Sequence, residues 1–102
     1  MNIISKPTII HYTEKYPAAS NSILAWYKAF SKASFQNFNE LKVVYNNASI
    51  LINKRVIFNI KGNSFRLIVA VDFKRQFAYV IWFGTHEEYD KIDAATVPYI
   101  EI

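Results

Sequence analysis

Hydrophobic and polar residues alternate in the second half of the chain, as they do in strands that bury one face. Residues 54–60 and 64–73 both follow this pattern, and their apolar positions are Val56, Phe58, Ile60, Phe65, Leu67, Val69, Val71 and Phe73. Arg66 and Asp72 fall on the opposite face of the second strand. A third apolar run, residues 77–83, is almost uninterrupted. We therefore expect it to be a strand covered on both faces.

Short polar segments separate these strands. The segment Lys61-Gly62-Asn63 has the composition of a tight turn, because Gly and Asn accept positive φ values. Residues 74–76 provide the second turn. The three strands are thus predicted to form an antiparallel meander. After them, Thr85 is suited to cap a short helix over residues 86–92, with Glu87 and Glu88 near its positive end.

The first half of the chain has helical spacing instead. Residues 2–4 are predicted as a short first strand, after which Ser5 caps a helix that Pro17 ends. A second amphipathic helix follows residues 20–22 and has an apolar face of Ile23, Leu24, Tyr27 and Phe30. Residues 33–52 contain several Asn and are expected to form loops around a short apolar piece at residues 41–45. The predicted fold class is α+β: a short first strand, two helices, an antiparallel meander and a short C-terminal helix.

Length and composition fit one domain over residues 1–102. Hydrophobic residues make up 52% of the chain and aromatic residues 17%, which is enough apolar surface for one core. The absence of Cys excludes disulfides and thiolate chemistry. The first residues do not resemble a signal peptide, and no apolar run approaches the ~20 residues that span a membrane. We expect a cytoplasmic protein without membrane contact.

Charge is distributed unevenly along the chain. The formal net charge is +4, but residues 1–86 hold 11 of the 12 basic residues against three acidic ones, a net +8. The segment from Glu87 onward has a net charge of −4. The basic region favours an anionic partner, which can be a nucleic acid, a membrane surface or an acidic protein.

Three motifs resemble those of the HigB family of RelE-like toxins, and the likeness runs from about Ile3 to Asp93. They are residues 14–17 (EKYP), 55–69 (RVIFNIKGNSFRLIV) and 85–90 (THEEYD). The resemblance implies a RelE-like fold and a ribosome-dependent endoribonuclease that cuts messenger RNA during translation. It also implies a cognate antitoxin that silences the toxin, expected to be a small helix-turn-helix protein.

RNA cleavage without a metal needs a base for the 2′-hydroxyl, a donor that stabilises charge on phosphorus, and an acid for the 5′-oxygen. Arg66 is the leading phosphate ligand, since its guanidinium can bind two oxygens at once. The alternative is a surface arginine paired with Asp72 or a terminal acid. His86 is the candidate acid or base, because imidazole changes protonation near neutral pH. Its alternative role is packing or plain surface exposure.

The remaining candidates depend on the same region. Tyr89 lies on the face of His86 if residues 86–89 are helical, so it can stack on a base or orient the phosphate; core packing is the alternative. Lys61 is a further candidate in catalysis. Lys54, Arg55, Lys61 and Arg66 are expected to form an RNA-binding patch. Taken singly, Lys54, Arg55 and Lys61 are better explained as solvated charges, and only together with Arg66 do they indicate a patch.

Cofactor chemistry has little support in the sequence. The two His, His11 and His86, are far apart, and no paired ligand spacing for a metal occurs. No glycine-rich phosphate loop is present, because the chain has only two Gly. We therefore expect neither metal nor cofactor. The competing class is a non-catalytic basic module that binds RNA or a protein.

Overall fold

A five-stranded sheet with the order β1-β5-β4-β3-β2 organises the computed structural model, which describes residues 1–99. Its strands are β1 (Asn2–Ile4), β2 (Ser49–Ile50), β3 (Arg55–Ile60), β4 (Phe65–Asp72) and β5 (Phe77–Thr85). Strands β2 to β5 pair antiparallel, which confirms the predicted meander. Strand β1 pairs in parallel with β5 and so joins the first residues to the last strand. The predicted α+β class is confirmed.

The helices have polar side-chain caps at their N-termini, except the second, which follows Ala19 and has no side-chain cap hydrogen bond. They are α1 (Lys6–Lys15), α2 (Ser20–Lys32), α3 (Phe38–Val44) and α4 (His86–Tyr89), and a single 3₁₀ turn at Pro17–Ala19 separates the first two. Ser5 caps α1 as predicted. The expectation of loops over residues 33–52 was wrong for α3, whose cap is Asn37: its side-chain oxygen accepts from the N–H of Glu40 at 2.9 Å. An Asn taken as a loop signal thus starts a helix.

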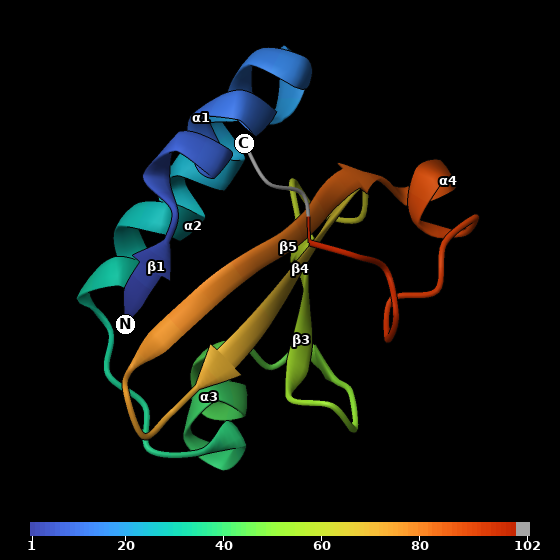
Figure 1. Ribbon diagram of the computed structural model, residues 1–102. Helices are drawn as coiled ribbons and strands as arrows, with labels where there is room; N and C mark the ends of the chain where they lie inside the picture. The colour runs from blue at the N-terminus through green and yellow to red at the C-terminus, as the bar shows by residue number, and fades with distance from the viewer. Residues whose placement is uncertain (100–102) are drawn as a thin grey trace.

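Helices α1 and α2 cover one face of the sheet and close the main core (Figure 1). Helix α1 contacts β5, while α2 contacts β1 and β3. The predicted face of α2 needs one correction, because Trp26 is buried with Ile23 and Phe30 whereas Leu24 is 39% exposed. The indole stacks on the ring of Phe30 with centroids 4.9 Å apart, and this large aromatic contact decides which side of the helix faces inward.

The opposite face of the sheet carries a second, smaller cluster. Ile57, Ile68 and Ile81 form its centre, and the segment after α4 packs on them through Ile92 and Val97. This cover explains why β5 is apolar on both faces, as predicted. Helix α4 is shorter than the expected 86–92: it ends at Tyr89, and the chain continues through turns. Figure 1 shows α4 and its following segment on the side of the sheet away from α1 and α2.

The β3–β4 turn places one end of the hairpin against the end of β5. Positive φ values occur at Lys61 (53°) and Gly62 (63°), whereas the sequence suggested Gly62 and Asn63. The first residue of β4, Phe65, is paired with Ile60 on β3 and Thr85 on β5. The turn and the start of α4 therefore lie at the same end of the sheet.

Among residues 1–99, no helix is both long and apolar enough to cross a membrane.

Candidate functional site

The turn at residues 61–64 and the start of α4 are joined by their backbones. The N–H of His86 donates to the carbonyl of Ser64 at 2.9 Å, which extends the β4–β5 pairing by one bond beyond Phe65 and Thr85. A short helix then turns the chain away from the sheet. This junction brings the His86 side chain to the hairpin turn, although Asn63 in that turn is 23 positions away along the chain.

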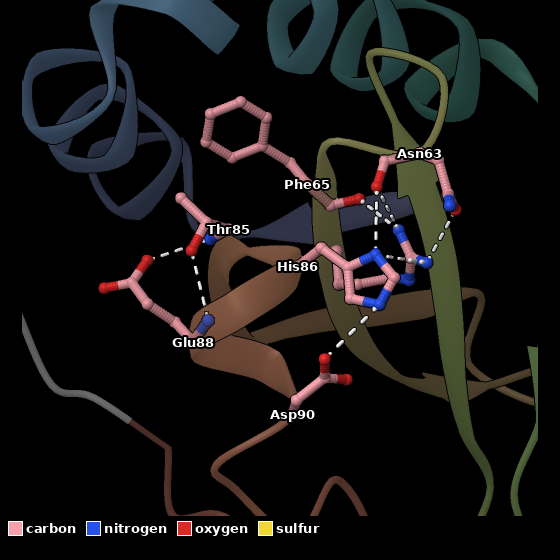
Figure 2. Close-up of polar contacts among 7 residues, drawn as sticks. Asn63, Phe65, Thr85, His86, Glu88 and Asp90 are labelled. Atoms are coloured by element: carbon pink, nitrogen blue, oxygen red, sulfur yellow. Dashed lines mark hydrogen bonds and ion pairs between the residues drawn. The ribbon is translucent and has the colours of Figure 1, made fainter.

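The His86 ring lies between an acceptor, a cation and a carboxylate. Its Nδ1 is 3.3 Å from the carbonyl oxygen of Asn63 and 3.4 Å from Nη2 of Arg66, and its Nε2 is 3.5 Å from a carboxylate oxygen of Asp90. Figure 2 shows the ring between Asn63 and Asp90. When Nδ1 carries a proton it can donate to Asn63, and when it does not it can accept from Arg66. The site thus accommodates His86 in both states of that nitrogen.

Arg66 comes from β4, on the face opposite the main core, and the turn holds its guanidinium in place. Nη1 donates to the carbonyl oxygens of Asn63 and Phe65, both at 3.1 Å, and Nη2 donates to the side-chain oxygen of Asn63 at 2.7 Å. Arg66 is not paired with Asp72, which instead accepts from the backbone N–H of Arg75. The guanidinium is partly exposed next to an imidazole, the kind of cation that binds a phosphate.

The ring of Tyr89 packs against the guanidinium of Arg66. The Arg66 Cζ lies 5.8 Å from the centre of the Tyr89 ring, within the range of a cation–π contact. Tyr89 in turn packs near Trp82, with ring centres 6.3 Å apart. Trp82 can lie over β5 because residue 84 is Gly: a Cβ there would stand 2.6 Å from Cη2 of the indole. Gly84 is also the strand partner of Arg66, so it permits the close packing beneath the site.

Helix α4 is fixed by a capping box. The Thr85 hydroxyl accepts from the N–H of Glu88 at 3.1 Å, and a Glu88 carboxylate oxygen accepts from the N–H of Thr85 at 2.9 Å. The same carboxylate oxygen accepts from the Tyr16 hydroxyl at 2.8 Å, which ties α4 to the end of α1. The hydrogen bond from Thr85 lowers the pKa of Glu88, whereas burial and the neighbouring Glu88 raise the pKa of Tyr16. Glu88 is therefore ionised and Tyr16 protonated at neutral pH.

A pocket of about 380 Å³ opens beside this junction. Ser64, Phe65, Thr85, His86 and Glu87 line it, so both the hairpin turn and the first turn of α4 contribute. Its volume lies at the lower end of small-ligand sites, which is the size for part of a nucleotide chain. His86 is thus within reach of a ligand from solvent.

The predicted site residues separate into two groups. Arg66, His86 and Tyr89 come together, and Lys61 lies exposed in the adjoining turn. Lys54 and Arg55 do not join them, because they lie five and four residues along the chain from Asn59, the strand partner of Arg66, which is ~17 and ~14 Å at ~3.4 Å per residue.

Arg55 has a structural role instead. Its Nη1 donates to the carbonyl oxygens of Ala94 at 2.9 Å and Val97 at 2.8 Å, which holds the segment after α4 against the sheet. The predicted patch of four basic residues is therefore not continuous. Basic residues of one hairpin can lie at opposite ends of its strands, and the pattern of charges in the sequence does not show whether they meet in space.

Asn63 and Asp90 were not identified as site residues from the sequence. Asn63 contacts both Arg66 and His86 through its backbone and side-chain oxygens, and Asp90 faces His86 from one helical turn later. The spacing of four residues between His86 and Asp90 is the available sequence signal. No comparable signal links Asn63 to His86, since only the strand pairing brings them together.

No group of three or more His, Asp or Glu side chains within residues 1–99 is arranged to hold a metal ion. The polar groups around His86 are instead the carbonyl oxygen of Asn63, the guanidinium of Arg66 and the single carboxylate of Asp90. This arrangement suits proton transfer and anion binding.

Comparison with known proteins reveals a consistent set of relatives. The chain is 29% identical over 92 residues to the mRNA interferase toxin HigB of Escherichia coli (strain K12), covering 88% of each chain. It has the same identity and coverage with the mRNA interferase HigB of Shigella flexneri. With the mRNA interferase HigB of Escherichia coli O6:H1 it is 27% identical over 94 residues, which is 90% of this chain and 91% of that one.

The family comparison covers the same elements. The model of the HigB_toxin family, described as the RelE-like toxic component of a toxin–antitoxin system, matches residues 19–92. This range begins before α2 and includes β3, β4, β5 and α4, and with them Arg66, His86 and Tyr89. The sequence match over most of the chain and the α+β fold agree, and the chain belongs to the HigB toxin family of RelE-like toxins.

Proposed function

We propose that this protein is an mRNA interferase, a ribosome-dependent endoribonuclease that cuts messenger RNA without a metal ion. The contact between His86 and Arg66 is the observation that carries the proposal. It puts an imidazole, a side chain that can both accept and donate a proton, beside a permanent cation on a surface that solvent reaches. Family membership and the names of the relatives support the same activity.

In this mechanism His86 transfers the proton. Cleavage begins when a base removes the proton of a 2′-hydroxyl, whose oxygen attacks the adjacent phosphorus, and ends when an acid protonates the departing 5′-oxygen. When Nδ1 of His86 is protonated, it donates to the carbonyl of Asn63. When Nδ1 is unprotonated, it accepts from Arg66. The Asp90 carboxylate stabilises the imidazolium formed after His86 takes up a proton.

Arg66 stabilises the negative charge that develops on the phosphate oxygens. Its present partners in the turn are Asn63 atoms at the protein surface, which phosphate oxygens can replace with stronger charge-assisted bonds. Tyr89 keeps the guanidinium oriented through its ring and is also placed to stack against a base. Lys61, exposed in the same turn, adds positive charge for the RNA backbone and is the alternative proton-transfer group.

The partner of this toxin is a cognate antitoxin, which we expect to be a helix-turn-helix protein. The basic excess of +8 in residues 1–86 is complementary to an acidic antitoxin surface. Such complementarity accelerates association and competes with RNA for the same charges.

Mapping messenger-RNA 5′ ends after induced expression tests the proposal. The wild-type chain should produce new 5′ ends on translated messages, and both Arg66→Ala and His86→Ala should lose them. Lys28→Ala, a change to an exposed lysine on α2, is the matched control and should cleave normally. A non-catalytic RNA- or protein-binding module would produce no new 5′ ends in any of these variants, and this outcome would refute the proposed activity.

A further inference from the structure

A second pocket lies on the other side of the β3–β4 hairpin from His86. Its volume is about 270 Å³, and it is formed by the loop after α3, the edge of β3 and the hairpin turn. Its lining residues include Tyr45, Asn46, Asn47, Phe58, Asn59 and Gly62. The proposed cleavage mechanism does not use this pocket, so its chemistry needs a separate explanation.

The chemistry of the pocket is neutral and amide-rich. Three of its lining residues are Asn, and none carries a formal charge. Within residues 1–99, the side-chain amides of Asn46, Asn47 and Asn59 make no hydrogen bond to the protein. Each amide offers two donors and an acceptor. A ligand that fits must therefore be uncharged at this point and rich in hydrogen-bonding groups.

The edge of β3 adds backbone groups to these amides. Strand β2 pairs with β3 only at Val56 and Ile57, so the edge beyond Ile57 has no strand partner. The Arg55 carbonyl accepts from Leu51 and therefore faces β2. In an antiparallel strand alternate residues face the same side, which directs the N–H and C=O of Asn59 toward the open edge as well. A donor and an acceptor on one residue can pair with the edge of a base.

The half-buried Tyr45 is the aromatic side chain of the pocket wall that a ligand can reach, and the buried ring of Phe58 packs behind it. Phe58 is buried and Tyr45 half-buried, with ring centres 5.1 Å apart at 82° to one another. Aromatic side chains are the usual stacking surfaces for unpaired bases. A volume of about 270 Å³ is just under the ~300 Å³ at which sites for small molecules begin, which leaves room for one planar ring system.

The loop that carries two of the Asn residues is held in place before any ligand binds. The Lys42 ammonium donates to the carbonyls of Asn46 at 2.9 Å and Ala48 at 2.7 Å, and the Ala48 N–H donates to the Tyr45 carbonyl at 3.0 Å. Ordering of the loop is therefore complete in the free protein, which lowers the entropic cost of binding.

The pocket is adjacent to the phosphate-binding arginine. Asn59 is the β3 partner of Arg66 on β4, so their backbones are one strand spacing apart, ~4.8 Å. Gly62 lines the pocket while Asn63, the next residue, holds both Arg66 and His86. A nucleotide chain bound at Arg66 can thus place a neighbouring base in the pocket.

We infer that this pocket binds the base of a nucleotide next to the cleaved bond and so contributes to the choice of cleavage site. The inference rests on the proposed function. The Asn amides and the open edge of β3 form hydrogen bonds with the edge of the base, and Tyr45 contacts its ring. The phosphate of the same strand is bound by Arg66.

Nuclear magnetic resonance titration tests base binding apart from cleavage. The four nucleoside 5′-monophosphates are added to the full chain, with ribose 5-phosphate as the probe that lacks a base. At least one nucleotide should shift the side-chain amide resonances of Asn46 and Asn47, and ribose 5-phosphate should not. The double variant N46A/N47A should bind that nucleotide about tenfold more weakly, because two hydrogen bonds are lost.

This double variant is compatible with the fold. Neither Asn46 nor Asn47 has a positive φ, so alanine can adopt both backbone conformations. Asn39→Ala, at an exposed position of α3 outside the pocket, is the matched control and should leave binding unchanged. Thermal melts of both variants verify that they are folded.

Mapping of cleavage sites tests the consequence for RNA. N46A/N47A should still cut RNA, but the base frequency at one position beside the cut should become more even than in wild type. If no nucleotide shifts the pocket resonances, or if the cleavage profile equals that of a cleaving wild type, the inference is wrong. If the wild type does not cleave and a nucleotide nevertheless shifts these resonances, the proposed function fails while base binding stands.

Discussion

Replacing His86 with alanine removes the group to which we assign proton transfer. General acid or base catalysis accounts for rate factors of ~10² to 10⁴, so single-turnover cleavage should slow by about that range. Glutamine can retain a hydrogen bond to Asn63, 3.3 Å from Nδ1 in the wild type, but it does not exchange a proton near neutral pH. His86→Gln should therefore be similarly slow.

The fold should tolerate both substitutions. The His86 side chain is 41% exposed, and its ring contacts are made at the surface. The start of α4 is held by groups other than the ring: the His86 N–H bonds to Ser64, and Thr85 and Glu88 form the capping box. Substitutions at such positions usually change the free energy of unfolding by less than ~1 kcal/mol. A large loss of activity would then reflect chemistry and not unfolding.

The assay is single-turnover cleavage of messenger RNA in isolated ribosomal complexes at saturating protein. Lys28→Ala changes an exposed residue of α2 outside the site and should cleave at the wild-type rate. Full activity of His86→Gln would refute the assignment and transfer the proton steps to Lys61 or Tyr89.

Further predictions concern the cation, the packing, the cap and metals. Arg66→Ala should reduce cleavage by a factor of at least ~10², which is the typical effect in enzymes of removing one donor that stabilises transition-state charge. In denaturant titrations it should lower the free energy of unfolding by only about 1 kcal/mol, because water hydrates the Asn63 and Phe65 oxygens that Arg66 contacts. Gly84→Ala should displace the Trp82 indole, changing its fluorescence, destabilising the fold by ~1–3 kcal/mol and slowing cleavage; unchanged fluorescence would contradict this packing. The pKa of Glu88 is lowered in the folded state by the Thr85 N–H, so its stabilisation is present above the ordinary carboxyl pKa and is lost as pH falls through the folded value. Glu88→Ala should accordingly lower the melting temperature at pH 7 and converge with wild type in acid. Finally, a chelator should leave cleavage intact when ribosome integrity is verified separately, whereas activity that is lost on chelation and restored by zinc or manganese would show a metal requirement.

Local patterns in the sequence were sufficient to identify most of the elements. The alternation in residues 64–73 places Arg66 opposite the core whatever the rest of the chain does, because side chains in a strand point to alternate faces. Ser5 and Thr85 were correctly identified as helix caps for the same local reason: their side chains bond to N–H groups three residues ahead. The cap at Asn37 was missed because Asn is equally common in turns.

Tertiary structure decided which of the candidate residues meet. His86 reaches Asn63 and Arg66 only because Phe65 pairs with Thr85, a contact between residues 20 positions apart that hydrophobic alternation does not specify. Periodicity determines which face a side chain occupies, but the strand register determines its neighbours.

The basic residues and the first strand illustrate the same difference. Arg55 and Arg66 share a face of the sheet, yet only Arg66 lies near His86, since strand length separates the two ends of the hairpin. The pairing of β1 with β5 and the packing of the segment after α4 on Ile57 likewise join distant parts of the chain. The sequence alone determined most of the elements, the buried faces of the strands and the family resemblance. The site itself depends on long-range pairing, which arises only when the whole core is assembled.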